Sequence, residues 1–201
     1  VPLGGGGAIY LAEYANRDSK IVKAVRLTAE TLAGIPSILY GLFGMMFFVT
    51  SLRWSYSLLA GGMTLAVMIL PLILRTTEEA LLSIPDSYRE GSFGLGAGRL
   101  RTVTRIVLPP AMSGILAGVV LGVGRAMGET MAVIMVAGNQ PRMPKGILQG
   151  VRTLTGNIVI EMGYAADLHR EALIATGVVL FVFILLINLC FSLVKGGEKN
   201  G

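Results

Sequence analysis

Four long apolar segments constrain the fold of this 201-residue chain more than any other feature. Residues 31–52, 54–75, 106–137 and 172–194 each reach the length of about 20 mostly apolar residues that a membrane-spanning helix needs. The first and fourth segments contain no charged residue, and the second contains none before Arg75. Soluble proteins rarely need several helices that are apolar on every side. The sequence therefore predicts an all-α, polytopic transmembrane helical bundle.

The composition supports a surface that faces lipid. Hydrophobic residues make up 53% of the chain and charged residues 14%, whereas a soluble domain carries about 25% charged residues. Residues 1–11 read as the end of a further apolar helix, and the chain begins with Val1 rather than with methionine. We therefore expect one transmembrane domain over residues 1–201, N-terminally truncated, with a partial first span.

Basic residues are concentrated in alternate connections between the apolar segments. Residues 13–30, residues 75–105 and the tail after Val194 together hold most of the lysine and arginine. Because these residues favour the cytoplasmic side of a membrane, the pattern predicts that residues 78–108 and the C-terminus are cytoplasmic. The basic residues behind the net charge of +5 thus lie in short loops between apolar segments, a distribution that fits membrane orientation better than a nucleic-acid-binding surface. We therefore expect no nucleic-acid partner.

Residues 78–108 form a polar, glycine-rich and basic loop between two predicted spans. Ser87 and Glu90 have the spacing of a capping box at a helix start, so Glu90 either caps this helix only or also contacts a partner. Gly96 and its glycine neighbours predict a flexible break, because glycine adopts positive φ without steric cost. Pro109 lies near the start of the next span, where proline is tolerated.

Two opposite charges interrupt the third apolar segment. Arg125 and Glu129 are four residues apart, which predicts that they share one face of a helix. A lone charge at the bilayer centre costs at least ~2.5–3.5 kcal/mol, so such residues face a partner or a cavity. Two interpretations remain open: an internal salt bridge with a packing role, or an anion route lined by Arg125 with Glu129 holding its guanidinium. An arginine suits phosphate because its planar fork binds two oxygens at once.

The same segment carries glycine residues at four-residue spacing, namely Gly114, Gly118 and Gly122. Small residues at this spacing allow two helices to approach closely within a membrane. The spacing therefore predicts a protein-facing stripe on this span.

The remaining reactive residues form no recognisable catalytic or metal site. His169 is the only histidine and Cys190 the only cysteine, and neither has partners at the spacing of metal ligands. The chain also lacks the Gly-Lys-Ser/Thr sequence of a phosphate-binding loop, so ATP would have to be hydrolysed by another subunit. We expect no enzymatic activity, no metal and no cofactor in this chain.

The spacing of Glu90, Gly96 and residues 106–109 resembles the signature loop of ABC-importer permeases, E-A-A-x3-G-x9-I-x-L-P. The two alanines of that pattern correspond to Gly91 and Ser92, which are also small. In this family the loop docks into a groove on a cytoplasmic ATPase. The resemblance implies a transmembrane domain of the type I importer kind, and an ATPase coupling loop formed by Ser87, Glu90, Gly91, Ser92, Gly96, Ile106, Leu108 and Pro109.

A second resemblance concerns the substrate. Residues 124–130, G-R-A-M-G-E-T, are similar to the R-A-x-G-E-T segment of the phosphate-specific permeases called PstC and PstA. Further similar stretches are residues 8–14, 32–41 and 75–80. The resemblance implies that Arg125 and Arg75 belong to a phosphate route, to which Glu129 is predicted to contribute by holding Arg125. An alternative of equal weight for Arg75 is that its side chain extends to the lipid headgroups. The early spans are more similar to PstA and residues 152–164 to PstC, so the type of subunit stays open.

Together these resemblances imply a permease subunit of an ATP-driven phosphate importer in the bacterial inner membrane. The implied partners are a second permease subunit, a dimer of ATP-binding subunits that holds ATP and Mg²⁺, an extracytoplasmic phosphate-binding protein and the lipid bilayer. One alternative is a permease for a different solute, and another is a channel or carrier that needs no ATPase. A membrane-embedded enzyme using Glu129 is a third alternative, but no nucleophile–base pair accompanies that residue.

Overall fold

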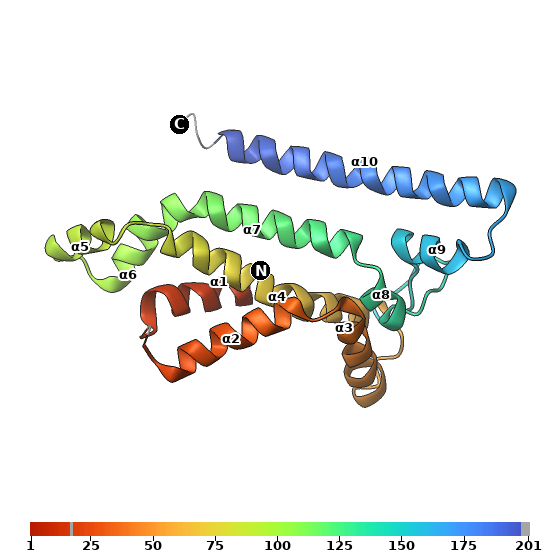
Figure 1. Ribbon diagram of the computed structural model, residues 1–201, viewed down its shortest axis with the longest axis horizontal. Coiled ribbons are helices and arrows are strands. Elements are labelled where there is room, and N and C mark those ends of the chain that lie inside the picture. Colours follow the sequence, from red (N-terminus) through yellow and green to blue (C-terminus); the bar gives the residue numbers. More distant parts are fainter. Residues whose placement is uncertain (17, 198–201) are drawn as a thin grey trace. The chain divides into compact units, whose positions relative to one another are not determined.

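The computed structural model describes residues 1–16 and 18–197, with side chains up to residue 191, and this part of the chain is built from helices (Figure 1). The elements are α1 (Pro2–Ile9), η1 (Tyr10–Tyr14), α2 (Lys20–Gly34), α3 (Ser37–Gly44), η2 (Met45–Ser51), α4 (Leu58–Leu82), α5 (Asp86–Gly94), α6 (Arg99–Thr102), η3 (Val103–Val107), α7 (Leu108–Gly128), α8 (Met131–Val136), α9 (Leu154–Glu161) and α10 (Asp167–Gly197), where η marks a π-helical turn. Turns and irregular segments connect the helices, and the β-type pairing in the described residues is an isolated bridge between Gly138 and Val151. The predicted all-α fold is confirmed. The predicted cytoplasmic C-terminus includes residues 198–201, which lie outside the described residues.

Several helices are long and apolar enough to cross a membrane. Among the described residues they are Leu58–Leu82, Arg99–Gly128 and Asp167–Phe191, and a fourth candidate is the broken pair Lys20–Gly34 and Ser37–Ser51. The break falls inside the predicted span 31–52, so this segment is not one continuous helix. Its cause is Pro36, because proline disfavours the helical conformation of the residue before it and removes one backbone donor.

The predicted span 106–137 is also divided. Helix α7 ends at Gly128, Glu129 lies outside it, and the separate short helix α8 follows. The expectation that Arg125 and Glu129 share one helical face is therefore wrong. At its other end α7 is continuous with the π-helical turn η3, which ends two residues before the proline pair Pro109 and Pro110. Prolines cannot donate the usual helical hydrogen bonds, which accounts for irregular backbone bonding next to them.

Helix α4 extends further than the apolar pattern predicts. It continues past Arg75 to Leu82, so the first residues of the predicted loop 78–108 are helical. Glu78 on this extension is buried, and the Arg26 guanidinium lies 2.6 Å from its carboxylate. An ion pair of this kind makes the burial of a carboxylate tolerable.

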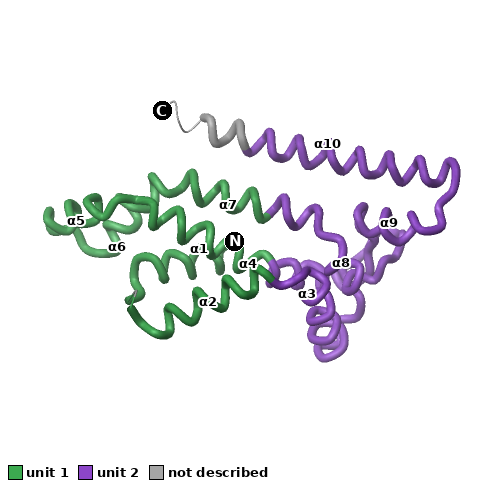
Figure 2. The backbone as a smooth tube through the Cα atoms, in the orientation of Figure 1, with its two compact units in different colours: residues 1–34, 69–122 green, residues 35–68, 123–201 purple. Residues whose placement is uncertain are grey.

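The described chain forms two compact units, residues 1–34 with 69–122 and residues 35–68 with the part from 123 onward (Figure 2). In the first unit, buried apolar side chains join α1, η1 and α2 to the second half of α4 and the start of α7. These side chains are Ala8, Leu11, Val22 and Leu74 in one cluster and Ala12, Leu81, Val107 and Ala111 in another. The core of this unit thus lies directly beside the segment that leads into α5.

Close packing of α4 against α7 in the first unit depends on small residues. A Cβ atom added to Gly118 would lie 2.3 Å from the Thr76 hydroxyl oxygen, and one added to Gly114 would lie 2.8 Å from the Ala80 methyl group. Gly122 approaches Ile69 in the same way, at 3.0 Å. The predicted protein-facing glycine stripe therefore packs against α4.

The second unit is built around α3 and α8. Gly41 lies against the backbone of Ala132, where an added Cβ would be 2.9 Å from the Ala132 Cα. Phe48, Ala60 and Val136 form a buried cluster next to this contact. Helix α10 packs on α9, and its side chains up to Phe191 are otherwise mostly apolar and exposed, as expected for a helix that faces lipid.

Candidate functional site

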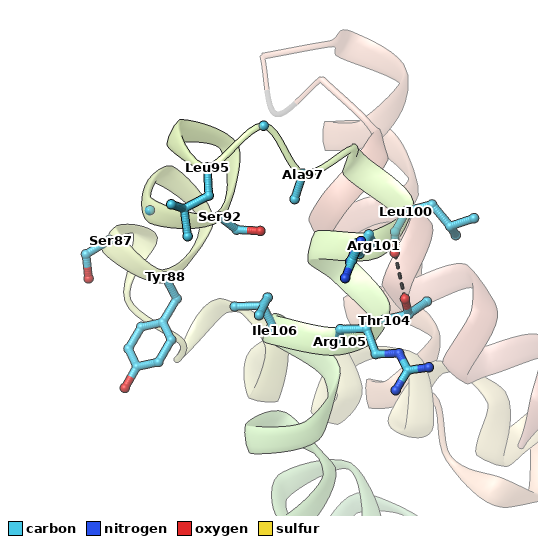
Figure 3. Close-up of a pocket in the computed structure, with 12 residues that line it drawn as sticks. Ser87, Tyr88, Ser92, Leu95, Ala97, Leu100, Arg101, Thr104, Arg105 and Ile106 are labelled. Carbon is cyan, nitrogen blue, oxygen red and sulfur yellow. Dashed lines mark hydrogen bonds between the residues drawn. The ribbon is translucent and has the colours of Figure 1, made fainter.

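The predicted coupling loop folds into two short arms that enclose a groove. Helix α5 forms the first arm, and α6 with η3 forms the second arm. The loop groove between them has a volume of about 1080 Å³ and is lined by Ser87, Tyr88, Gly91, Ser92, Leu95, Gly96, Ala97, Leu100, Arg101, Thr104, Arg105 and Ile106. Figure 3 shows Tyr88, Ser92 and Leu95 on one side of the groove and Leu100, Arg101 and Thr104 on the other.

The turn between the arms depends on Gly96. Its φ of +79° lies in the left-handed region, which costs other residues free energy because of their Cβ atom. Below the turn, the hydroxyl oxygens of Ser92 and Thr102 lie 2.8 Å apart and are both buried, so a hydrogen bond joins α5 to α6. The Arg99 guanidinium lies 5.8 Å from the centre of the Tyr14 ring, which connects the second arm to η1 by a cation–π contact.

The chemistry of the loop groove suits a protein partner. Leu95 is 90% exposed and Leu100 is 69% exposed, so both leucines are available for contact with a partner. Arg101 and Arg105 are the charged residues among those that line the groove, so it is basic as well as apolar. Exposed leucines beside arginines are typical of interface surfaces, where apolar contact supplies affinity and charge supplies orientation.

The structure brings together five of the eight predicted loop residues, because Ser87, Gly91, Ser92, Gly96 and Ile106 all line the loop groove. The predicted capping box is wrong. Helix α5 begins at Asp86, its N-cap is Pro85, and no side chain caps it, so Ser87 lies inside the first turn. Glu90 is exposed on α5 outside the groove.

The other two predicted loop residues, Leu108 and Pro109, begin helix α7. Leu108 packs partly buried against the cluster of Ala12, Leu81 and Val107, whereas Pro109 is exposed. Leu108 thus anchors the start of α7 to this cluster, and neither residue lines the groove.

The predicted pathway residues lie in different parts of the fold. Arg125 is exposed near the end of α7, and buried Tyr40 of α3 interacts electrostatically with it. Glu129 does not pair with it: no ion pair within the described residues joins the two side chains. Instead, the Glu129 carboxylate accepts hydrogen bonds from the backbone N–H groups of Thr130 (3.1 Å) and Ala132 (3.2 Å). It therefore acts as a cap at the start of α8.

Arg75 belongs to the first unit, where it forms an exposed ion pair with Glu79 one turn later on α4, at 2.9 Å. A small cavity of about 180 Å³ lies beside this pair and is also lined by Arg26, Glu30 and Glu78. Three carboxylates and two guanidinium groups make this cavity a poor site for an anion. The geometry around Arg75 therefore gives no support for direct contact with phosphate.

Several residues of the loop groove were not predicted from the sequence. Tyr88, Leu95 and Leu100 were missed because a single apolar residue in a polar loop carries no periodic signal. The basic stretch that contains Arg101 and Arg105 was predicted as part of the loop, and its position beside leucines is the signal that could have indicated the groove.

Comparisons with known proteins found one matching family and several related sequences. Residues 4–196 match the model of the protein family described as "Binding-protein-dependent transport system inner membrane component". Over 199 residues the chain is 40% identical to the probable ABC transporter permease protein YqgH of Bacillus subtilis, covering 93% of this chain and 64% of that protein. Over 213 residues it is 34% identical to the phosphate transport system permease protein PstC of Mesorhizobium japonicum, again covering 93% and 64%. The chain thus spans slightly less than two thirds of the length of these relatives.

A solved structure supports the fold independently. The inward-facing MetNI methionine ABC transporter contains a chain that superposes with a TM-score of 0.77 at 22% sequence identity, covering 98% of this chain and 84% of that chain. At this level of identity the likeness concerns the arrangement of helices alone.

Proposed function

Because the chain belongs to the family of binding-protein-dependent transport system inner membrane components, a family of multi-pass transport subunits rather than enzymes, we propose that it is the permease subunit of an ATP-driven phosphate importer. In this role its helices form part of the translocation pathway, and its loop groove receives a separate ATP-hydrolysing subunit. The observation that carries the proposal is the two-armed loop, which presents exposed leucines and arginines between two spans of a family member.

The proposed partners follow from the family and from the chemistry of the loop groove. ATP and Mg²⁺ are bound by a dimer of ATP-binding subunits, and one of these contacts α5 and α6. A second permease subunit completes the pathway, and an extracytoplasmic binding protein delivers the solute. The concentration of basic residues in the connections on the loop side supports a cytoplasmic loop and C-terminus.

Coupling then depends on rigid connections between the loop and the spans. Closure of the ATP-binding subunits moves α5 and α6 together, because the Ser92–Thr102 hydrogen bond joins them. Helices α4 and α7 carry this movement into the membrane, since their glycine-mediated packing leaves little room for independent sliding. The pathway consequently changes between outward and inward access.

Phosphate as the solute is supported by two observations. The PstC relative is named a phosphate transport permease, and Arg125 presents an exposed guanidinium at the end of an apolar helix. A guanidinium remains charged at every working pH and binds two phosphate oxygens through parallel hydrogen bonds. Glu129 contributes by fixing the start of α8 rather than by holding Arg125. For Arg75, whose ion pair with Glu79 disfavours direct contact with phosphate, we propose contact with lipid headgroups rather than with the route.

Uptake of radiolabelled phosphate tests the proposal in cells that express the full-length subunit together with its partner subunits. Arg125→Ala should reduce uptake strongly, and Arg125→Lys should recover only part of it because lysine lacks the bidentate fork. Arg142→Ala is the matched control, since Arg142 is an exposed arginine in the connection between α8 and α9. Unchanged uptake in Arg125→Ala would remove this residue from the route. If the complex takes up another solute in an ATP-dependent manner but no phosphate, that solute and not phosphate is the substrate.

A further inference from the structure

A buried ion pair connects the coupling loop to the first helix of the chain. Arg89 of α5 donates from Nη2 to Glu13 Oε1 at 2.6 Å and from Nε to both carboxylate oxygens at 3.2 Å. The side chains are only 11% and 6% exposed, respectively. Glu13 belongs to the π-helical turn η1, and 76 residues separate it from Arg89 in the sequence.

Arg89 also binds the end of α4. Its Nη2 donates to the Leu81 carbonyl oxygen at 2.9 Å and its Nη1 to the Ile84 carbonyl oxygen at 2.8 Å. The last carbonyl groups of a helix have no partner within the helix, so a side chain that supplies donors there fixes the helix end. One guanidinium thus contacts α5, the C-terminal end of α4 and η1.

The loop reaches η1 a second time from its other arm. Arg99 of α6 lies over the ring of Tyr14, the residue next to Glu13. Both arms therefore contact adjacent residues of one π-helical turn. Such turns contain a locally irregular hydrogen-bonding pattern, as seen here in the bond from the Ala15 N–H to the Tyr10 carbonyl oxygen.

A role in local folding alone explains this arrangement poorly. Arg89 already has an exposed partner one turn away, because Nη1 lies 3.1 Å from the Asp86 carboxylate, which is 67% exposed. Pairing with the exposed Asp86 costs little free energy, whereas pairing with Glu13 requires that both charged groups lose their contact with water. The buried pair instead fixes the distance between two elements that the sequence keeps far apart.

We propose that Arg89 and Glu13 form a latch that transmits movement of the coupling loop to η1 and to helix α1, which η1 continues. The inference rests on the proposed function, because the movement comes from an ATP-hydrolysing subunit bound at the loop groove. Arg89 is a positioning residue in this scheme: it contacts neither the solute nor ATP. When α5 moves, the latch moves η1 and the end of α4 with it, so that three elements respond as one body.

The test uses the full-length subunit in its purified complex, reconstituted in lipid vesicles with the binding protein. The measured quantity is the amount of phosphate imported per ATP hydrolysed, normalised to the amount of assembled complex. Glu13→Gln retains the size of the side chain but removes its charge, and should lower this ratio about tenfold because it removes the buried ion pair between α5 and η1. Asp86→Asn removes only the exposed pair and should leave the ratio within about twofold of the wild-type value.

A purely structural role predicts a different result. Glu13→Gln would then reduce the yield of assembled complex, while the import per ATP of each assembled complex would equal that of the wild type. That outcome would overturn the latch. It differs from failure of the proposed function, in which the wild-type complex itself imports no phosphate or contains no ATP-hydrolysing subunit.

A second variant keeps the inference testable if Glu13→Gln does not assemble. Glu13→Cys with Arg89→Cys, in a Cys190→Ser background, replaces the ion pair by two thiols that a short bifunctional reagent can connect. The complex should be uncoupled before the reaction and recover import per ATP after it. Equal ratios before and after complete cross-linking would refute mechanical transmission through this contact.

Discussion

Replacing Gly118 with alanine is expected to weaken the packing of α4 against α7, because the added methyl group has no space. It would lie 2.3 Å from the Thr76 hydroxyl oxygen and 2.8 Å from the Thr76 Cβ, whereas ordinary van der Waals contact begins at 3.4 Å. The helices must therefore separate by about 1 Å, or Thr76 must give up its hydrogen bond to the Leu72 carbonyl oxygen. Overpacking of this kind costs about 1–3 kcal/mol.

Gly124→Ala provides the matched control for this substitution. Gly124 lies on the same helix, and an added Cβ atom there meets no atom within 4 Å. Both variants exchange glycine for alanine, so the gain in helix propensity of about 1 kcal/mol is common to them and cancels in the comparison. The difference in the free energy of unfolding between the two variants then isolates the packing cost.

The assay is denaturant-induced unfolding of the full-length subunit in detergent micelles, followed by circular dichroism. We expect Gly118→Ala to be about 1–3 kcal/mol less stable than Gly124→Ala. Equal stability of the two variants would show that α4 and α7 do not pack through Gly118, and the proposed route of movement from the loop into the membrane would lose its structural basis.

Three further predictions concern the loop and the second unit. Gly96→Ala should strain the turn by about 1–2 kcal/mol because φ is +79°, and should weaken retention of the ATP-hydrolysing subunit during purification, whereas Gly94→Ala, at an open position of α5, should not. Thr153→Ala removes the hydroxyl that accepts the Gly156 N–H at the start of α9, so the unit should lose about 1 kcal/mol of unfolding free energy in a denaturant titration; no change would exclude this cap. Hydrogen bonds from Tyr164, and to a smaller extent from Arg152, hold the pKa of Glu161 below its ordinary value. The ionised Glu161 carboxylate therefore stabilises the folded state fully above the ordinary carboxyl pKa of about 4.3, and this contribution is lost as the pH falls through the lowered pKa. Glu161→Gln should remove this part of the acid dependence of stability, and an unchanged acid profile would contradict the assignment.

The sequence predicted the fold class because hydrophobic length is a property of each segment taken alone. It failed where tertiary partners decide the outcome. Glu78 follows an apolar segment and reads as the start of a loop, yet Arg26 from another helix pairs with it and lets α4 continue to Leu82. Pro36 is a local signal for the helix break before α3. The break was not predicted because the segment contains no charge and was therefore interpreted as one continuous span.

The candidate site shows the same division between local and distant information. Gly96 was identified as a break from its residue type alone, because glycine adopts a positive φ without steric cost, and its φ is indeed positive. The spacing of Arg125 and Glu129 predicted a shared face, but Gly128 ends the helix and the Glu129 carboxylate caps α8 instead. The contact between Glu13 and Arg89 could not be predicted, since nothing in either local sequence indicates that η1 and α5 meet.

Site-specific cross-linking from the loop tests the central claim most directly. A cysteine at Leu95, the most exposed apolar residue of the loop groove, would be introduced into the full-length subunit in a Cys190→Ser background, with Ile147→Cys in the connection between α8 and α9 as the control. The account predicts that Leu95→Cys forms an adduct with the co-expressed ATP-hydrolysing subunit and that Ile147→Cys forms none. Labelling of Leu95→Cys by a membrane-impermeant thiol reagent in intact cells, with no adduct to that subunit, would contradict the account.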